Sequence, residues 1–148
     1  MSEVAWELAH SVDAEASPAF VWSFWTDVTN WDDPPAQFAL DGPFAAGVRG
    51  TTVMPGRDDR HWAIVDVRRG ESFTMEMPLD RAVLSFTWRF DAVTDRRTKL
   101  TQRIVLSGEN AAAYTEQVRA GFGSTLADGM KRIAGLIERA EARTQSAG

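Results

Sequence analysis

The chain has 148 residues, of which 44% are apolar and 25% charged, and this is ordinary for a single globular domain over residues 1–148. It contains no cysteine, which excludes disulfides, thiolate chemistry and cysteine-based zinc sites. The formal net charge is −5 and there is no long basic run, so we do not expect nucleic acid as the main partner.

The chain is predicted to begin with a strand and a short helix. Residues 4–14, VAWELAHSVDA, alternate larger apolar side chains with smaller or polar ones, as in a strand with one buried face. Ser17 is a preferred N-cap residue and Pro18 suits the first helical position, so a helix is expected to begin here. The prolines at 34 and 35 end this region, which has room for one or two short helices.

Residues 36–107 are predicted to form six further strands. The last three of these segments alternate apolar with polar side chains, and turn signals such as TDRR at 94–97 separate the segments. The segments are QFALDG, VRGTTVM, HWAIVDV, SFTMEMPL, AVLSFTWRFDAV and TKLTQRIVLSG. Strands of this kind joined by short turns are typical of an antiparallel meander with one face in water.

One long helix is predicted over residues 110–143, with Asn110 as its cap. Apolar residues step along it by three and four positions and form one stripe. Four glycines between 121 and 135 each cost roughly 1 kcal/mol relative to alanine inside a helix. Either the helix bends at these glycines, or another part of the backbone approaches it closely.

The widths of the predicted elements do not match. Seven strands at about 4.8 Å each span roughly 30 Å, whereas a helix is only about 10 Å wide. One long helix therefore leaves part of the concave face of the sheet uncovered. The apolar volume that remains is either collapsed core or a chamber for a ligand.

The order of elements resembles a known superfamily at this point. SPAFVWSFWTDVTNW and LDGPFAAGVRGTTVMPG resemble the START/Bet v 1-like (SRPBCC) superfamily, and most closely its bacterial polyketide cyclase/dehydrase and lipid transport branch. The resemblance covers about residues 3–143. It implies an α+β helix-grip fold, in which a seven-stranded curved antiparallel sheet surrounds a long C-terminal helix, with two short helices after the first strand. It also implies a hydrophobic cavity, no cofactor, and roles that range from polyketide cyclisation to lipid carriage.

The sequence departs from the family pattern after Trp31. Many relatives carry a second Trp or a Pro soon after the corresponding Trp, whereas here Trp31 is followed by two aspartates and two prolines at 32–35. The resemblance therefore does not define the shape of the nearby mouth of the cavity.

A set of mainly aromatic and sulfur-containing side chains is expected to line that cavity. They come from several elements, and their apolar bodies exceed the need of a small core; methionine in addition adapts to varied ligands. For any one of them, ordinary core packing is the alternative. The expected lining residues are Trp31, Phe38, Trp62, Met75, Met77, Phe86, Trp88, Gln102, Tyr114, Val118 and Phe122.

Four polar residues are candidate catalytic groups. Gln102 lies on an apolar strand face, where an unpaired amide costs roughly 1–3 kcal/mol, so it contacts either a ligand or another side chain. Glu76 and Arg89 could reach into the cavity, but the alternation favours a cross-strand ion pair on the outer face. The hydroxyl of Tyr114 either reaches the cavity mouth or stays in water while the ring packs.

Other chemistry has weaker support. His61 follows Asp58 and Asp59, which is compatible with a general base or a metal ligand, but a solvated turn explains the pattern better, and we predict no metal. The sequence contains no phosphate-binding loop, zinc-protease motif or nucleophile elbow. It contains no run of the roughly 20 apolar residues that a membrane span needs and no recognisable targeting segment, so a cytoplasmic protein is expected.

Three hypotheses about function follow. The first is a monomer or homodimer that binds a polyketide-like or lipid-like molecule in an internal cavity, and that would act without a cofactor if it is a cyclase or dehydratase. The second is a carrier or sensor without catalysis. The third is a protein-interaction module resembling activators of the Hsp90 ATPase, which predicts a collapsed cavity and an exposed apolar patch.

Overall fold

A computed structural model describes residues 4–31 and 35–147. The elements are, in chain order, β1 (Val4–Ala14), α1 (Pro18–Trp25), the short 3₁₀ helix η1 (Val28–Asn30), β2 (Gln37–Leu40), β3 (Arg49–Val53), β4 (Arg60–Arg68), β5 (Ser72–Leu79), β6 (Ala82–Thr94), β7 (Arg97–Ser107), η2 (Ala111–Tyr114), α2 (Thr115–Phe122) and α3 (Leu126–Ala147). The seven predicted strands and the two short helices after the first strand are confirmed. Within the described ranges, no helix combines the length and apolar character needed to cross a bilayer.

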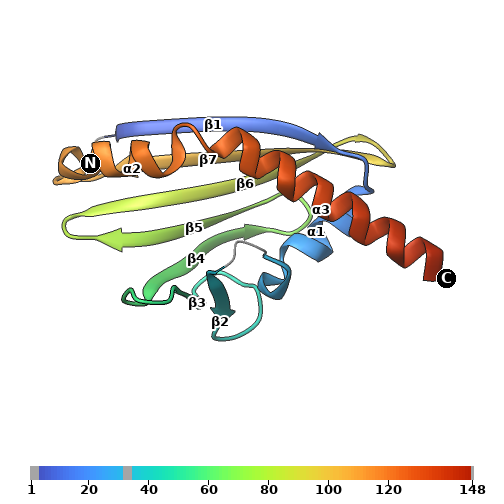
Figure 1. Cartoon of the computed structure of the whole chain (residues 1–148), viewed down its shortest axis with the longest axis horizontal. Coiled ribbons are helices and arrows are strands. Elements are labelled where there is room, and N and C mark those ends of the chain that lie inside the picture. Colours follow the sequence, from blue (N-terminus) through green and yellow to red (C-terminus); the bar gives the residue numbers. More distant parts are fainter. Residues whose placement is uncertain (1–3, 32–34, 148) are drawn as a thin grey trace.

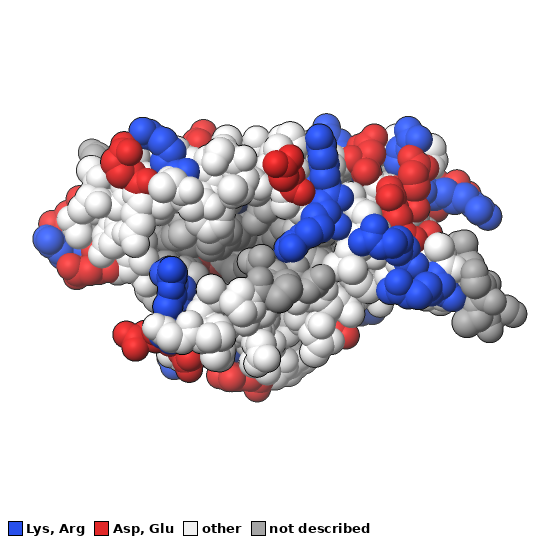
Figure 2. Space-filling model, in the orientation of Figure 1, with Lys and Arg blue, Asp and Glu red and all other residues white. Residues whose placement is uncertain are grey.

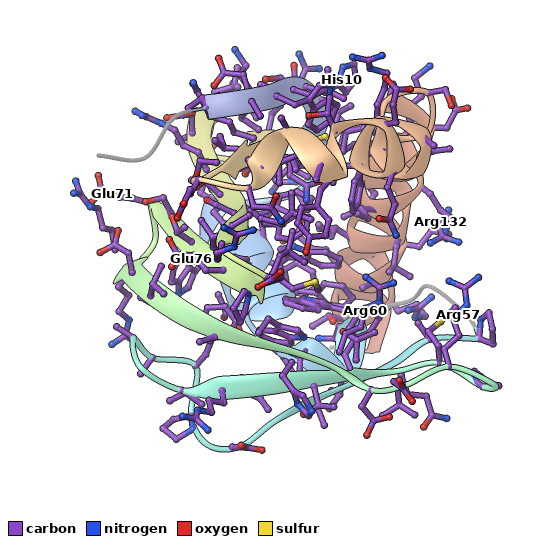
Figure 3. The ribbon with its side chains drawn as sticks, turned by 90° about the vertical axis from the view of Figure 1, so that its left-hand side faces the viewer. His10, Arg57, Arg60, Glu71, Glu76 and Arg132 are labelled. Carbon is purple, nitrogen blue, oxygen red and sulfur yellow. The ribbon has the colours of Figure 1, made fainter. Side chains whose placement is uncertain are left out.

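The strands form one antiparallel sheet in the order β1-β7-β6-β5-β4-β3-β2. Chain neighbours pair throughout, except that β1 from the beginning of the chain joins β7. The sheet curls from β1 round to β4, and the helices lie across its open side (Figures 1 and 3). The predicted fold class, a curved antiparallel sheet with a long C-terminal helix, is therefore confirmed.

The long helix α3 covers only one side of the concave face. Its apolar stripe, which includes Met130, Ala134 and Ile137, is buried and lies chiefly against β1. Figure 1 shows α3 running along the β1 side of the sheet, with β2 and β3 on the opposite side. Because α3 lies to one side, the inner faces of β3, β4 and β5 have room for something else.

The prediction of a single long helix over 110–143 is wrong, because the structure has three separate elements there, η2, α2 and α3. The break lies between Phe122 and Leu126, where Thr125 Oγ1 donates to the carbonyl of Gly121 over 3.0 Å. Asn110 does not act as a side-chain cap, since its amide instead donates to the carbonyl of Asp80 over 3.1 Å. The glycine-rich segment therefore interrupts the helix.

Two carboxylates of α3 hold the beginning of α1. Ser17 caps α1 by accepting from the N–H of Phe20, as predicted. Its own hydroxyl donates to Glu141 over 2.8 Å, and its N–H points to the same carboxylate. The N–H of Glu15 donates to Glu138 over 2.7 Å. These contacts fix α1 against α3 and so set the position of the aromatic residues that α1 carries.

Candidate ligand pocket

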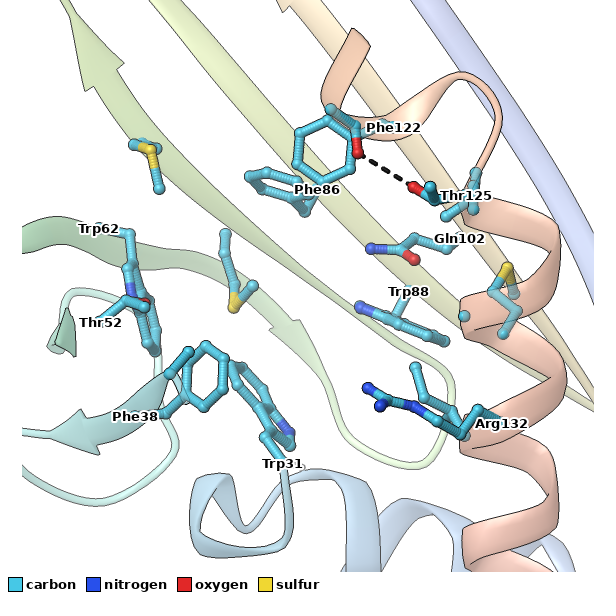
Figure 4. Close-up of a pocket in the computed structure, with 18 of the residues that line it drawn as sticks. Trp31, Phe38, Thr52, Trp62, Phe86, Trp88, Gln102, Phe122, Thr125 and Arg132 are labelled. Atoms are coloured by element: carbon cyan, nitrogen blue, oxygen red, sulfur yellow. Dashed lines mark hydrogen bonds between the residues drawn. The ribbon is translucent and has the colours of Figure 1, made fainter. Parts of the chain in front are cut away.

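A pocket of about 670 Å³ lies between α2–α3 and the inner face of the sheet. This volume falls within the range of small-molecule sites. Figure 2 shows the hollow in this face, with mostly uncharged walls and with Lys and Arg side chains gathered beside it. Figure 4 shows rings from the strands on one side and α3 on the other. The pocket therefore occupies the part of the concave face that the long helix does not cover.

Most of the side chains expected to line a cavity meet in this pocket, although the elements that carry them lie far apart in the sequence. Val118 is not among them, because it is buried in the core. Tyr114 is not among them either, and its hydroxyl accepts a hydrogen bond from the N–H of Asp80 over 3.2 Å. The expected residues that do line the pocket are Trp31, Phe38, Trp62, Met75, Met77, Phe86, Trp88, Gln102 and Phe122.

Two indoles form a stacked part of the wall. The rings of Trp31 and Trp62 are 5.6 Å apart and inclined by 27°. Each ring is oriented by a hydrogen bond, because Trp31 Nε1 donates to the carbonyl of Trp25 over 2.8 Å and Trp62 Nε1 donates to Thr52 Oγ1 over 3.0 Å. Phe38 meets Trp31 edge to face at 5.4 Å. This part of the wall is held in place before any ligand binds.

Local sequence explains why both indoles lie there. Asp27 caps η1 by accepting from the N–H and the hydroxyl of Thr29, and this short turn directs the chain into Trp31. Gly50 on β3 faces Trp62, and a Cβ at Gly50 would lie 2.3 Å from the indole. Only glycine allows the indole of Trp62 to lie flat across β3.

Trp25 belongs both to the core and to the pocket. It is only 5% exposed and meets Trp88 edge to face at 5.4 Å, yet it also lines the pocket. Its Nε1 is buried, and it is the only such side-chain atom without a hydrogen-bond partner in the part of the chain that the structure describes. Trp25 was not among the residues that the sequence predicted to line a cavity.

Gln102 brings an amide to this largely apolar wall. It lies on β7, where it pairs in register with Trp88 on β6 and with His10 on β1. Figure 4 shows its side chain among Trp88, Phe86 and Thr125. The amide has no hydrogen-bond partner among the described residues, and it is half-buried. It is therefore available to a molecule in the pocket.

Glu76 and Arg89 do not line the pocket, which agrees with the outer-face position that strand alternation favoured for them over a position in the cavity. Met75 and Met77 face the pocket, and strand alternation consequently turns Glu76 to the outer face. Arg89 is exposed and pairs with Asp91 at 3.2 Å on its own strand. The two candidates therefore do not form the alternative cross-strand pair with each other either.

His61 is exposed on β4, with its Nδ1 3.3 Å from Thr51 Oγ1. Across residues 4–31 and 35–147, no three His, Asp or Glu side chains are close enough together to hold a metal ion. Of the departure from the family pattern at 32–35, residues 32–34 lie outside the described residues.

The pocket also contains residues that sequence reasoning did not assign to it. Leu126, Met130 and Ile133 belong to the predicted apolar stripe, so their spacing was a usable signal. Asp128 and Arg132 carried no such signal, because a charged residue on a helix is usually in water. The other lining residues that were missed are Trp25, Ala36, Thr52, Met54, Gly121, Thr125 and Gly129.

Solved structures share this architecture over nearly the whole chain. Norcoclaurine synthase from Thalictrum flavum, as a point mutant with a transition state analogue, has a TM-score of 0.69 at 10% identity, covering 98% of this chain and 97% of that one. A protein from Arthrobacter aurescens has a TM-score of 0.67 at 14% identity, covering 93% and 91%. Protein Ms6760 from Mycobacterium smegmatis has a TM-score of 0.62 at 17% identity, covering 96% and 98%.

At such low identities these similarities establish the fold alone, which is the Bet v 1-like helix-grip fold. No curated protein sequence matches the chain significantly. The model of one family, described as polyketide cyclase / dehydrase and lipid transport, matches residues 5–138. The match covers most of the sheet and most of α3, and with it the residues that build the pocket. The chain therefore belongs to the polyketide cyclase/dehydrase and lipid transport family.

Proposed function

We propose that this protein binds a hydrophobic small molecule of polyketide-like or lipid-like chemistry in the pocket between α3 and the sheet. The observation that carries the proposal is a pocket of about 670 Å³ whose walls are mainly aromatic and methionine side chains. Burying apolar ligand surface against such walls gains roughly 25 cal/mol for each Å² removed from water. Membership of the family supports a hydrophobic ligand as well.

Carriage or sensing is better supported than acid–base catalysis. Among the described lining residues, only Asp128 and Arg132 carry ionisable side chains, and both are exposed on α3. The earlier candidates Glu76, Arg89 and Tyr114 all lie outside the lining. A general acid or base must come within hydrogen-bond reach of the reacting group, and the pocket offers few such groups. Norcoclaurine synthase, with the same fold, was solved with dopamine and hydroxybenzaldehyde, so catalysis on this scaffold is the second candidate function.

The protein-interaction hypothesis has less support. It predicts a collapsed cavity and a contiguous exposed apolar patch. The structure instead has an open pocket, and the most exposed large apolar residues in the described chain are valines on four different strands. These residues are Val4, Val53, Val65 and Val93.

The proposal is tested by native mass spectrometry of the purified protein and by titration with Nile red. We expect either a co-purified hydrophobe or saturable uptake of the dye. Met77→Lys places a charge in the pocket wall and should abolish uptake, because an ammonium group in an apolar pocket is poorly solvated. Val65→Lys, on the exposed side of the neighbouring strand β4, is the matched control and should bind the dye like the wild type.

Two results would contradict the proposal. One is a wild-type protein that carries no co-purified molecule and takes up no dye. The other is a folded Met77→Lys protein that binds Nile red as well as the Val65→Lys protein does. A ligand recovered with unchanged mass and an unchanged NMR spectrum after prolonged incubation supports carriage, whereas a ligand recovered as a cyclised isomer of the same mass or with the mass of a dehydrated product supports catalysis.

A further inference from the structure

We propose that the pocket selects a planar aromatic ligand carrying a carbonyl or hydroxyl oxygen that pairs with the Gln102 amide, in preference to a saturated acyl chain. This inference rests on the proposed function, because it names the class of molecule that the same pocket takes. Three independent features of the lining carry it: the number and placement of its rings, the sulfur atoms between them, and the one unpaired amide.

The first feature is that aromatic rings line the pocket from several directions. Seven of the lining side chains are aromatic, and they come from α1, β2, β4, β6, α2 and the segment after η1. Figure 4 shows Trp31, Phe38 and Trp62 on one side, with Phe86, Phe122 and Trp88 facing them across the pocket. Rings attract other rings through stacked and edge-to-face contacts beyond the area they bury, and a saturated chain gains only the area.

The second feature is the chemistry of the remaining wall. Met54, Met75, Met77 and Met130 line the pocket, whereas Leu126 and Ile133 are the only branched aliphatic side chains among the described lining residues. A thioether makes favourable contacts with the edge of an aromatic ring that it does not make with an alkyl chain. The wall is therefore matched to a ring system.

The third feature is rigidity combined with one polar contact. The indoles of Trp31 and Trp62 are fixed by their own hydrogen bonds. The side of the pocket that faces Phe86, Phe122 and Trp88 is therefore preformed. A flat, rigid ligand loses little conformational freedom on entering such a pocket, unlike an alkyl chain. Gln102 has no partner among the described residues and can both donate and accept. A ligand oxygen above Trp88 would satisfy the amide.

The test uses three small probes on the full-length protein, measured by calorimetry and by the indole N–H resonances of the 15N-labelled protein. They are 2-naphthol, naphthalene, and an aliphatic alcohol, 1-heptanol, whose octanol–water partitioning is checked to match that of 2-naphthol. We expect 2-naphthol to bind at least about fivefold more tightly than 1-heptanol. We also expect the indole resonances to shift with both aromatic probes.

The role of Gln102 is tested by Gln102→Leu, with Gln117→Leu on the exposed surface of α2 as the matched control. Gln102→Leu should weaken 2-naphthol binding by about fivefold to tenfold, since one hydrogen bond is lost, and should change naphthalene binding by less than about twofold. Gln117→Leu should change neither. If Gln102→Leu does not fold, Gln102→Met, which keeps the length of the side chain, replaces it.

The outcomes separate this inference from the proposed function. If Nile red binds but 1-heptanol binds as tightly as 2-naphthol, the preference for an aromatic ligand is wrong and the proposed function stands. If 2-naphthol binding is the same in the wild type and the Gln102 variant, the assignment of Gln102 is wrong. If neither Nile red nor any probe binds, the proposed function and this inference both fail.

Discussion

At Gly50, the lack of a side chain decides where an indole of the pocket wall can lie. A Cβ there would lie 2.3 Å from two ring atoms of Trp62, which is far inside van der Waals contact. Gly129 on α3 also lines the pocket, but a Cβ there would meet no atom within 4 Å. The two glycines therefore give opposite expectations for the same substitution.

Gly50→Ala is expected to lower the free energy of unfolding by about 1–3 kcal/mol, because the Trp62 ring must move out of a well-packed position. It should also weaken Nile red binding. Gly129→Ala should instead raise the free energy of unfolding by roughly 0.5–1 kcal/mol, because alanine restricts the unfolded chain and suits a helix. Urea unfolding measures both effects. Equal stability of the two variants would show that Trp62 does not rest on β3 as described.

At the scale of elements, hydrogen bonds to two carboxylates of α3 hold the start of α1 in place. Glu141 accepts from the N–H and the hydroxyl of Ser17, and Glu138 accepts from the N–H of Glu15. Hydrogen bonds to charged groups are stronger than neutral ones. The C-terminal half of α3 thus fixes the start of the helix that carries Trp25 into the pocket wall.

Glu141→Ala is expected to lower the free energy of unfolding by about 1–3 kcal/mol, because two part-buried donors lose their acceptor. Glu116→Ala is the control, since Glu116 makes only an exposed pair with Arg119 on α2, and it should cost less than about 0.5 kcal/mol. Thermal unfolding followed by circular dichroism measures both. A Glu141 variant no less stable than the Glu116 variant would contradict this account of the helix contact.

At the scale of the whole molecule, the pocket links ligand binding to stability. The walls come from elements far apart in the chain, so a ligand that fills the pocket would contact α3, β2 and β6 at once. An unfolded chain does not bring these elements together. A ligand that binds only the folded chain must therefore stabilise the entire domain.

Nile red at about a hundredfold its Kd should raise the free energy of unfolding by roughly 2.7 kcal/mol. For a chain of this length, that corresponds to a rise in Tm of about 5–10 °C by calorimetry. The Met77→Lys protein should show no rise. A wild-type Tm that stays constant as the dye saturates the protein would mean that the dye binds outside the folded pocket.

The sequence by itself determined the seven strands and the start of the first helix. Alternation over residues 4–14 and in the last three strand segments, with turn signals around the other three, predicted all seven strands, because side-chain period and turn chemistry are local properties. The same alternation placed Met75 and Met77 on one face and Glu76 on the other. Ser17 and Pro18 marked the start of α1, since capping depends only on neighbouring residues.

Only the tertiary structure decided how those elements enclose a pocket. Trp31, Trp62 and Trp88 line one pocket because the sheet curls and α3 lies to one side of it, and no local sequence pattern specifies either the curl or that position. The glycines had made a bend in the C-terminal helix one of two expectations, but the way α2 and α3 pack on the sheet decides that this break brings Phe122 and Thr125 to the pocket. Periodicity tells which side of a strand is apolar, whereas the separation between distant strands is set by packing of the whole molecule.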